Sequence, residues 1–250
     1  MTLVARYITT ADASDLTFSV CSLVQSQQKY DRLLASFARQ GFTAENSEFL
    51  AADNRDVNRF DGFSWHKALL AEARGRFVIF CHDDIELLDQ GFAELLGWTR
   101  WLDETDPHWL VAGIAGGVWR TESHPKPALA LHITDKFGGN RRRGTLPSRV
   151  ESLDECFTLM RRARPVISAY DIGGFHLYGT DLCLQAELLG GSAYAIDFHL
   201  RHTGQGIAGG LYRSVRRRFV RKYETYFPKR KLNTVNGFVE FGSPEGPAGG

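Results

Sequence analysis

The residues best suited to chemistry lie between Arg76 and Glu86, in the segment R-F-V-I-F-C-H-D-D-I-E. Five apolar residues, Phe77 to Cys81, run directly into His82, Asp83 and Asp84. An apolar run of this length predicts a central strand buried on both faces, and open α/β sheets bind ligands at the carboxyl ends of such strands. Carboxylates there are suited to hold a divalent cation, which in turn holds phosphate oxygens. A simpler interpretation is that Asp83 or Asp84 caps the following turn.

The composition is that of an ordinary globular chain. Its 250 residues are 43% hydrophobic and 24% charged, which allows a substantial core. The net charge of +1 argues against a dedicated nucleic-acid-binding protein. No apolar run approaches the roughly 20 residues that span a bilayer, and residues 1–7 are too short for a signal peptide, so we expect a cytoplasmic protein. Without a C-x-x-C pair, the four cysteines are expected to be buried free thiols: Cys21, Cys81, Cys156 and Cys183.

The spacing of apolar residues predicts alternating strands and helices in the first half of the chain. The expected strands are 18–24, 48–52, 77–81 and 109–114. The expected helices are 30–39, 64–74 and 89–102, the last capped by Asp89. This alternation predicts a largely parallel sheet with helices on both faces.

The second half of the chain is less regular. Residues 116–149 contain prolines, the glycines Gly138 and Gly139 and the arginine triplet Arg141 to Arg143, and they predict a long loop. Residues 150–160 have the composition of a strand, and 181–189 predict a helix closed by glycine. The segment 194–202 alternates, which places His202 at the end of its apolar face.

Three motifs in this order resemble those of the family 2 glycosyltransferases, in particular a bacterial branch whose metal motif is H-D-D. They are A-R-G-R-F-V-I-F-C-H-D-D, F-H-L-Y-G-T-D-L-C-L-Q-A and D-F-H-L-R-H-T-G, and the resemblance covers Phe18 to Gly204. It implies an α/β fold of the nucleotide-sugar-binding GT-A type, with a mostly parallel central sheet and helices on both faces. We expect this domain at 1–208, a basic helical extension at 209–240 and a disordered tail at 241–250.

The resemblance implies roles for the matching residues. Asp84 takes the place of the usual metal ligand, and His202 matches a histidine that approaches the metal and the diphosphate. His82 replaces an Asp that approaches the ribose, and Asp53 matches the acidic residue that reads the nucleobase or the ribose. For His202, a structural alternative is a strand-end histidine bonded to a backbone carbonyl. The expected donor-binding residues are Asp53, Asn54, His82, Asp83 and Arg142.

Two departures from the family concern the catalytic base and the nucleotide. The acidic pair before the acceptor-side helix reads Tyr178-Gly179 here, and the usual Pro-x-Tyr-Asn opening is replaced by residues 22–27. Asp181 is the nearest remaining carboxylate and the expected general base of an inverting transfer, with Asp154 as the alternative. A plain helix cap is the structural interpretation of Asp181.

The implied reaction moves a sugar, of the hexosyl type, from a UDP-, GDP- or dTDP-sugar to an acceptor hydroxyl. The acceptor class is a sugar, a glycan, a protein or a lipid-linked molecule, with no nucleic acid involved. The expected cofactor is Mn²⁺ or Mg²⁺, which neutralises the departing diphosphate. The mixed oxygen and nitrogen ligands Asp84 and His202 are more natural for Mn²⁺.

Two basic segments have alternative interpretations. Arg141 to Arg143 could close on the diphosphate as a lid or form a solvated loop. The helix expected at 211–223 could touch an anionic membrane at its inner face, or pack its apolar side on the domain.

Two other functions remain open. A catalytically inactive GT-A-like binding domain is favoured by glycine at 179. A metal-dependent phosphohydrolase is favoured by the His82-Asp83 dyad, although such enzymes carry the dyad on a helix and here it follows a strand-like run.

Overall fold

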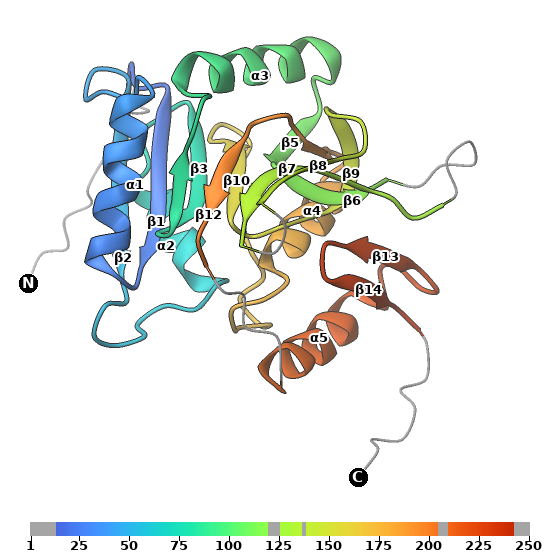
Figure 1. Ribbon diagram of the computed structural model, residues 1–250. Helices are drawn as coiled ribbons and strands as arrows, with labels where there is room; N and C mark the ends of the chain where they lie inside the picture. Colours follow the sequence, from blue (N-terminus) through green and yellow to red (C-terminus); the bar gives the residue numbers. More distant parts are fainter. Residues whose placement is uncertain (1–13, 120–125, 137–138, 205–209, 243–250) are drawn as a thin grey trace, which may run out of the picture.

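A curled sheet of twelve strands organises the computed structural model, which describes residues 14–119, 126–136, 139–204 and 210–242 (Figure 1). The strands are β1 (Phe18–Val24), β2 (Ser47–Asp53), β3 (Phe77–His82), β4 (Ile85–Leu87), β5 (Trp109–Gly113), β6 (Ala115–Val118), β7 (Leu129–Asp135), β8 (Gly139–Arg143), β9 (Ser148–Leu153), β10 (Phe157–Arg161), β11 (Ser192–Ala195), β12 (Leu200–His202), β13 (Lys231–Thr234) and β14 (Gly237–Glu240). The helices are α1 (Gln27–Arg39), α2 (Ser64–Glu72), α3 (Phe92–Thr105), α4 (Tyr178–Leu188) and α5 (Gly210–Tyr223). The large sheet has the order β2-β1-β3-β10-β5-β11-β9-β6-β7-β12-β4, with β8 paired to β7.

The central part of the sheet is mostly parallel, as predicted. Strands β2, β1, β3, β5 and β11 run in one direction, and β10 runs the opposite way between β3 and β5. In β3, Phe77, Ile79 and Cys81 face a core covered by α1 and α3. The alternate residues Val78 and Phe80 face a second core covered by α2 and α4. Both faces of β3 are therefore buried, which explains its uninterrupted apolar run.

The prediction of a long loop at 116–149 is wrong for most of the segment. Its described residues form β6, β7 and β8, which join the sheet by antiparallel pairing, while 120–125 and 137–138 lie outside the described residues. Strand β7 buries Ala130, Leu131 and Ile133, whereas β8 is largely exposed and carries the arginine triplet on an edge strand. Pairing with β7 overrides the weak strand propensity of the charged residues in β8.

Several boundaries differ from those predicted. Helix α3 begins at Phe92 rather than after Asp89, because the Gly91 N–H donates to Glu94 Oε2 (2.8 Å) and the Phe92 N–H donates to Gln40 O (2.9 Å). Helix α4 begins at Tyr178, so Asp181 lies inside its first turn. The segments 150–160 and 194–202 each divide in two, because irregular backbone at 154–156 and 196–199 interrupts the pairing.

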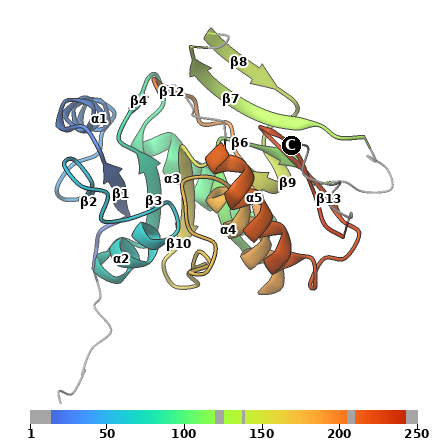
Figure 2. The same ribbon diagram turned by 90° about the horizontal axis from the view of Figure 1, so that it is seen from below.

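The C-terminal segment packs on the domain through a third core. Helix α5 buries Val215, Phe219 and Tyr223 against residues of α4, and Figure 2 shows the two helices side by side. The hairpin β13–β14, which the sequence did not predict, completes this core. Phe241, the first residue of the expected tail, is 2% exposed and belongs to this core. Residues 243–250 lie outside the described residues, and so does the expected domain boundary at 208. Among the described helices, none is both long and apolar enough to cross a bilayer.

Candidate functional site

The carboxyl ends of β1, β2 and β3 lie at one edge of the sheet. In the register of these parallel strands, Val24 is opposite Asp53, and Leu23 is opposite His82. Helix α1 begins at Gln27, immediately after β1, and its N-terminus is therefore at the same edge. This is where open α/β sheets bind ligands, and it is where the sequence predicted the donor-binding residues.

Three predicted residues meet at this edge. His202 Nε2 lies 3.2 Å from Asp84 Oδ1 and 3.4 Å from His82 Nδ1. The possible ligand atoms of the three side chains all lie within 4.8 Å of one another. The strand pairing explains the convergence, because β12 pairs with β4 and places His202 opposite Ile85, the residue after Asp84.

The charges of these side chains depend on one another. Burial raises the pKa of Asp84, but both histidines and Lys29 together lower it more, and the net pKa is below the ordinary value. Burial lowers the pKa of His202, but Asp84 more than offsets this effect, and the net pKa is raised. The pKa of His82 is lowered, chiefly by burial and to a smaller extent by the neighbouring charge of His202. The site therefore favours an ionised Asp84 and a neutral His82, which are the states that bind metal, whereas a bound cation would have to displace the proton that is favoured on His202.

The arrangement fits a divalent cation. Asp84 Oδ1 is buried and has no hydrogen-bond donor among the described residues, although His202 lies close to it. Gly204 keeps the adjacent space free, because a Cβ there would lie 2.7 Å from Asp84 Oδ2 and 2.8 Å from His202 Nε2. Two imidazole nitrogens and a carboxylate oxygen suit Mn²⁺ or another transition metal better than Mg²⁺. His82, Asp84 and His202 are the residues that would hold it.

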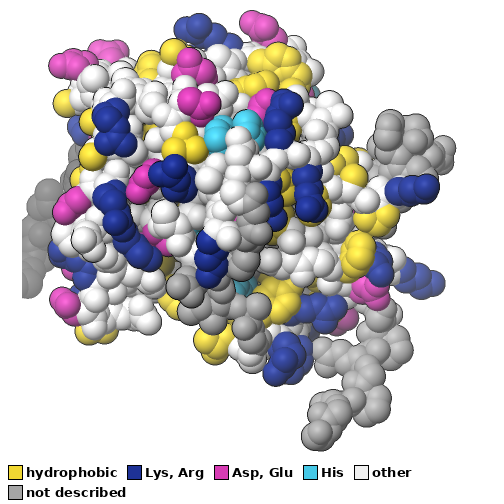
Figure 3. Space-filling model, viewed as in Figure 1, with side chains coloured by type: hydrophobic (Ala, Val, Ile, Leu, Met, Phe, Trp, Pro, Cys, Tyr) yellow, Lys and Arg dark blue, Asp and Glu magenta, His cyan; other side chains and the backbone are white. Residues whose placement is uncertain are grey.

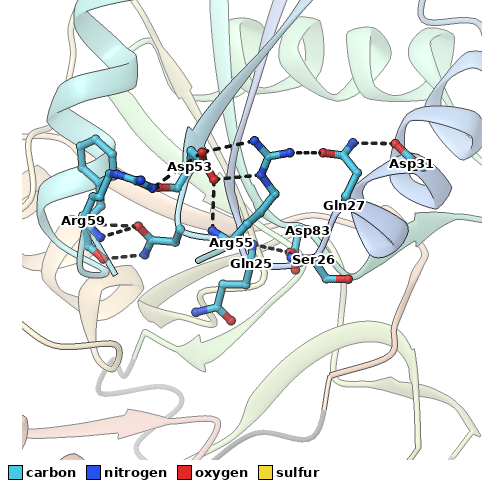
Figure 4. Close-up of polar contacts among 10 residues, drawn as sticks. Gln25, Ser26, Gln27, Asp31, Asp53, Arg55, Arg59 and Asp83 are labelled. Carbon is cyan, nitrogen blue, oxygen red and sulfur yellow. Dashed lines mark hydrogen bonds and ion pairs between the residues drawn. The ribbon is translucent and has the colours of Figure 1, made fainter. Parts of the chain in front are cut away.

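Asp83 points away from this cluster. Its Oδ2 accepts hydrogen bonds from the backbone N–H groups of Gln25 (2.7 Å) and Ser26 (2.8 Å), as Figure 4 shows. The side chain is 5% exposed. Asp83 thus fixes the turn between β1 and α1, which agrees with the capping interpretation.

Asp53 ends β2 and Asn54 follows it, and Figure 4 shows Asp53 with its partner Arg55. Asp53 Oδ1 accepts from Arg55 Nε at 2.9 Å, and these bonds with Arg55 hold the pKa of Asp53 at about 2. Arg55 Nη1 also donates to Gln27 Oε1 at 2.8 Å and so connects the end of β2 to α1. The buried Asn54 accepts from the N–H groups of Arg59 and Phe60, which shapes the loop after β2. Asp53 remains partly exposed at the edge of the sheet, whereas the side-chain amide of Asn54 is hydrogen-bonded to backbone groups of the loop.

Arg142 belongs to a different cluster. It pairs with Asp197, whose other oxygen lies 2.6 Å from His132 Nδ1. The rings of His132 and His199 are stacked, with centroids 4.2 Å apart. Arg141 is likewise paired, to Asp135, so the arginine triplet forms part of a paired strand and not a loop.

The two predicted catalytic carboxylates have different environments. Asp181 is completely buried, and its oxygens accept from Ala169 N (2.8 Å) and from the Tyr223 hydroxyl. Burial raises the pKa of Asp181 to about 7. This placement argues against a role as general base, because no acceptor hydroxyl reaches a fully enclosed carboxylate.

Asp154 is more accessible. It is partly exposed in the turn after β9, where its Oδ1 accepts from Cys156 N at 2.9 Å. The carbonyl of Cys156 accepts from the His82 N–H at 3.1 Å, so this turn borders the end of β3.

Three neighbouring residues were not predicted from the sequence. Lys29 Nζ lies 3.2 Å from Asp84 Oδ2, and the Tyr178 hydroxyl lies 2.6 Å from His82 Nε2. Glu155 Oε1 accepts from Leu177 N at 2.6 Å, and burial together with Asp154 raises the pKa of Glu155 to about 8. Each belongs to an element whose position relative to β3 only the fold reveals.

A cavity of about 430 Å³ lies elsewhere, beside the end of α2, and is lined by Glu72, Arg74 and Arg162 among others. Arg74 is paired with Glu48, and Arg162 donates to Gly75 O before β3 begins. The cavity therefore adjoins the amino end of β3, opposite the clustered residues, and we assign it no part in the site.

The chain has a close relative of known sequence. It is 57% identical over 239 residues to a protein of Fuscovulum blasticum named "ATP synthase subunits region ORF 6", and the match covers 96% of each chain. The chain belongs to the family of this protein. The relative's name states no activity, and no protein-family model matches the chain.

Solved glycosyltransferase structures are similar to the fold. Residues 1–349 of S. aureus TarS in complex with UDP-GlcNAc match with a TM-score of 0.54 and 15% identity, over 84% of this chain and 67% of that one. This chain spans 40% of the longer TarS structure. The mannosyltransferase PcManGT from Pyrobaculum calidifontis, in complex with GDP-Man and Mn²⁺, matches with a TM-score of 0.50 and 12% identity, over 90% of this chain and 69% of that one. These similarities confirm the predicted GT-A type of fold.

Proposed function

We propose that this protein is a glycosyltransferase that moves a sugar from a nucleotide-sugar donor to an acceptor hydroxyl. The main support for the proposal is the cluster of His82, Asp84 and His202 at the carboxyl end of β3, in which the buried Asp84 Oδ1 has His202 alone close to it among the described residues. The neighbours of similar fold were solved with UDP-GlcNAc and with GDP-Man and Mn²⁺, which supports a UDP- or GDP-sugar donor of the hexosyl type. The H-D-D motif further supports membership of the corresponding branch of family 2.

The donor diphosphate is proposed to lie beside this cluster. A bound Mn²⁺ would act there as a Lewis acid that neutralises the charge of the departing nucleoside diphosphate. Asp53, exposed at the end of the neighbouring strand β2, is proposed to bind the nucleoside, and Asp83 supports the site by fixing the turn that leads into α1. Arg142 is bound to Asp197, so a role in donor binding requires that this ion pair opens.

The transfer is proposed to be inverting, with Asp154 as the general base. An inverting displacement needs one carboxylate beside the acceptor hydroxyl, on the side opposite the leaving group. Asp154 is partly exposed in the turn that borders β3, whereas Asp181 is enclosed. Of the two carboxylates that the sequence indicated, Asp154 is therefore favoured by its surroundings.

A cytoplasmic location with contact to the inner face of a membrane is proposed on the basis of α5. Its solvent side carries Arg213, Arg217 and Arg221, for which no partner is found among the described residues, and Leu211 is 73% exposed at its start. Figure 3 shows lysine and arginine side chains on the surface around this helix. A basic helix with exposed apolar residues suits an anionic lipid surface. Co-sedimentation with vesicles that contain anionic lipid, but not with neutral vesicles, is the expected result.

Release of nucleoside diphosphate tests the main proposal. The protein is incubated with MnCl₂ and a panel of UDP-, GDP- and dTDP-sugars, and the free diphosphate is measured. Release from one nucleotide class supports a transferase, because such enzymes slowly hydrolyse their donor without an acceptor. Binding of a nucleotide sugar without release indicates the inactive binding domain that glycine at 179 favours. The phosphohydrolase alternative is weakened, because His82 ends β3 and does not lie on a helix.

A further inference from the structure

A lysine forms an ion pair with one oxygen of Asp84, the carboxylate that is proposed to bind the metal. Lys29 Nζ lies 3.2 Å from Asp84 Oδ2, while Oδ1 of the same carboxylate faces His202. Lys29 belongs to the first turn of α1, which begins at the carboxyl end of β1. Its side chain is 40% exposed, whereas that of Asp84 is 10% exposed. The lysine thus reaches the site from the solvent side.

Lys29 is placed where it would compete with a divalent cation for Asp84. Among the described residues, Asp84 is the sole partner found for Lys29 Nζ. A lysine has a flexible stem and a strongly hydrated charge, so it leaves such a contact readily. A cation held by His82, Asp84 and His202 repels the nearby ammonium group and takes over its partner.

Part of the backbone at the start of α1 is already hydrogen-bonded within the protein. A helix N-terminus normally binds anions through its free N–H groups. Here the N–H groups of Gln25 and Ser26 donate to Asp83, and the Lys29 N–H donates to Ser26 Oγ at 3.4 Å. Lys29 carries the one cationic side chain in the first turn of α1, so it adds a full positive charge to the N–H groups of that turn.

We propose that Lys29 holds Asp84 until a divalent cation binds, and then pairs with the diphosphate of the donor. The proposal rests on the proposed function, because it takes a nucleotide diphosphate as the ligand and a cation at Asp84. When the cation is bound, its charge and that of Lys29 together exceed the single charge of Asp84. The excess positive charge matches a diphosphate, with which an ammonium group forms charge-assisted hydrogen bonds.

The experiment measures metal and nucleotide binding separately, in wild type and in Lys29→Met. The metal affinity is obtained by titration with MnCl₂ alone, in which the free Mn²⁺ is detected by electron paramagnetic resonance. We expect Lys29→Met to bind Mn²⁺ more tightly by up to roughly fivefold, since the competing ion pair is gone. Calorimetric titration with UDP and with GDP at saturating Mn²⁺ should show weaker binding of the preferred nucleotide, by roughly tenfold or more.

Two further variants serve as controls. Lys67→Met removes an equivalent charge from the exposed side of α2 and should change neither affinity. Lys29→Arg keeps the charge, so it should retain nucleotide binding and should bind Mn²⁺ no more tightly than wild type, since arginine pairs with a carboxylate at least as firmly as lysine does.

The possible failures are distinguishable. If wild type binds no Mn²⁺, the metal site of the proposed function is wrong, and the inference about Lys29 falls with it. If wild type binds Mn²⁺ and a nucleotide but Lys29→Met binds both as wild type does, Lys29 is a plain surface ion pair and the proposed function stands. Weaker nucleotide binding without tighter Mn²⁺ binding contradicts the competition for Asp84.

Discussion

His202 Nε2 and Asp84 Oδ1 lie 3.2 Å apart, although one residue ends β12 and the other follows β3. Their proximity depends on the short strand β4, which begins directly after Asp84 and pairs antiparallel with β12. The Asp84 carbonyl also accepts from the N–H and the hydroxyl of Thr203, each at 3.0 Å. Backbone pairing therefore holds the two side chains together before any ligand binds, as preorganised sites require.

Removal of the Asp84 carboxylate should abolish metal binding. Asp84→Asn keeps the shape of the side chain but removes the charged ligand oxygen. Since loss of a group that merely orients a ligand costs about 10–100-fold in metal affinity, we expect at least roughly 100-fold weaker Mn²⁺ binding by calorimetry. Asp31→Asn, on the exposed side of α1, is the control. Retained Mn²⁺ affinity in Asp84→Asn would place the metal elsewhere.

The two candidate bases should respond differently to amide substitution. Asp154→Asn is expected to lower donor turnover by roughly 10²–10⁴-fold with little change in donor affinity. Asp181→Asn places an amide group opposite a buried donor, Ala169 N or the Tyr223 hydroxyl, and should cost about 1–3 kcal/mol of stability. Turnover and thermal unfolding are measured on both variants. Full turnover in Asp154→Asn together with its loss in well-folded Asp181→Asn would reverse the assignment.

Gly179 should tolerate no side chain. A Cβ there would lie 2.6 Å from Leu153 O, because α4 packs closely against the end of β9. Gly179→Ala is therefore expected to lose about 1–3 kcal/mol of unfolding free energy. Gly97→Ala in the middle of α3 meets nothing within 4 Å and should gain about 0.5–1 kcal/mol. Denaturant unfolding of both variants checks this contrast, and a fully stable Gly179→Ala would show that the two elements are not in such close contact.

The contribution of Glu155 to the stability of the protein should fall as pH rises toward 8. Burial and Asp154 raise the pKa of Glu155 from 4.5 to about 8. Between these values the folded state holds a proton that the unfolded state has released, so increasing pH favours unfolding, by up to ~1.4 kcal/mol per pH unit. Glu155→Gln keeps an oxygen for the Leu177 N–H and should make the dependence less steep between pH 5 and 8, with a remaining slope from Asp181, whose pKa is raised to about 7. Chemical unfolding across that range, with the exposed Glu104→Gln as control, should show the flattening in Glu155→Gln alone.

The first half of the fold was predictable from the sequence because each element carries its own signal. The apolar run Phe77 to Cys81 is buried on both faces, and the helices around it have one apolar side. The second half was harder. Strand β8 consists largely of arginines and exists because β7 lies beside it, and the 196–199 irregularity interrupts an otherwise regular alternation. Such effects of tertiary context are absent from local patterns.

The site was predictable to the extent that its residues lie at strand ends. Asp84 follows the apolar strand β3 and His202 ends β12, and the structure brings them together with His82. Asp181 has the same kind of local signal, an acid in the first turn of a helix, but the packing of α5 over α4 encloses it. Lys29 carries no motif at all. Whether a charged residue faces the ligand or the core depends on elements far away in the chain.

The dependence of nucleotide binding on a cation tests the central claim most directly. Wild-type protein is titrated with UDP and with GDP in the presence of MnCl₂, and again after EDTA treatment. We expect that one nucleotide binds with Mn²⁺ and that this binding is lost with EDTA and in Asp84→Asn. Nucleotide binding that is unchanged by EDTA and by Asp84→Asn, or no binding of either nucleotide with Mn²⁺, would contradict the claim.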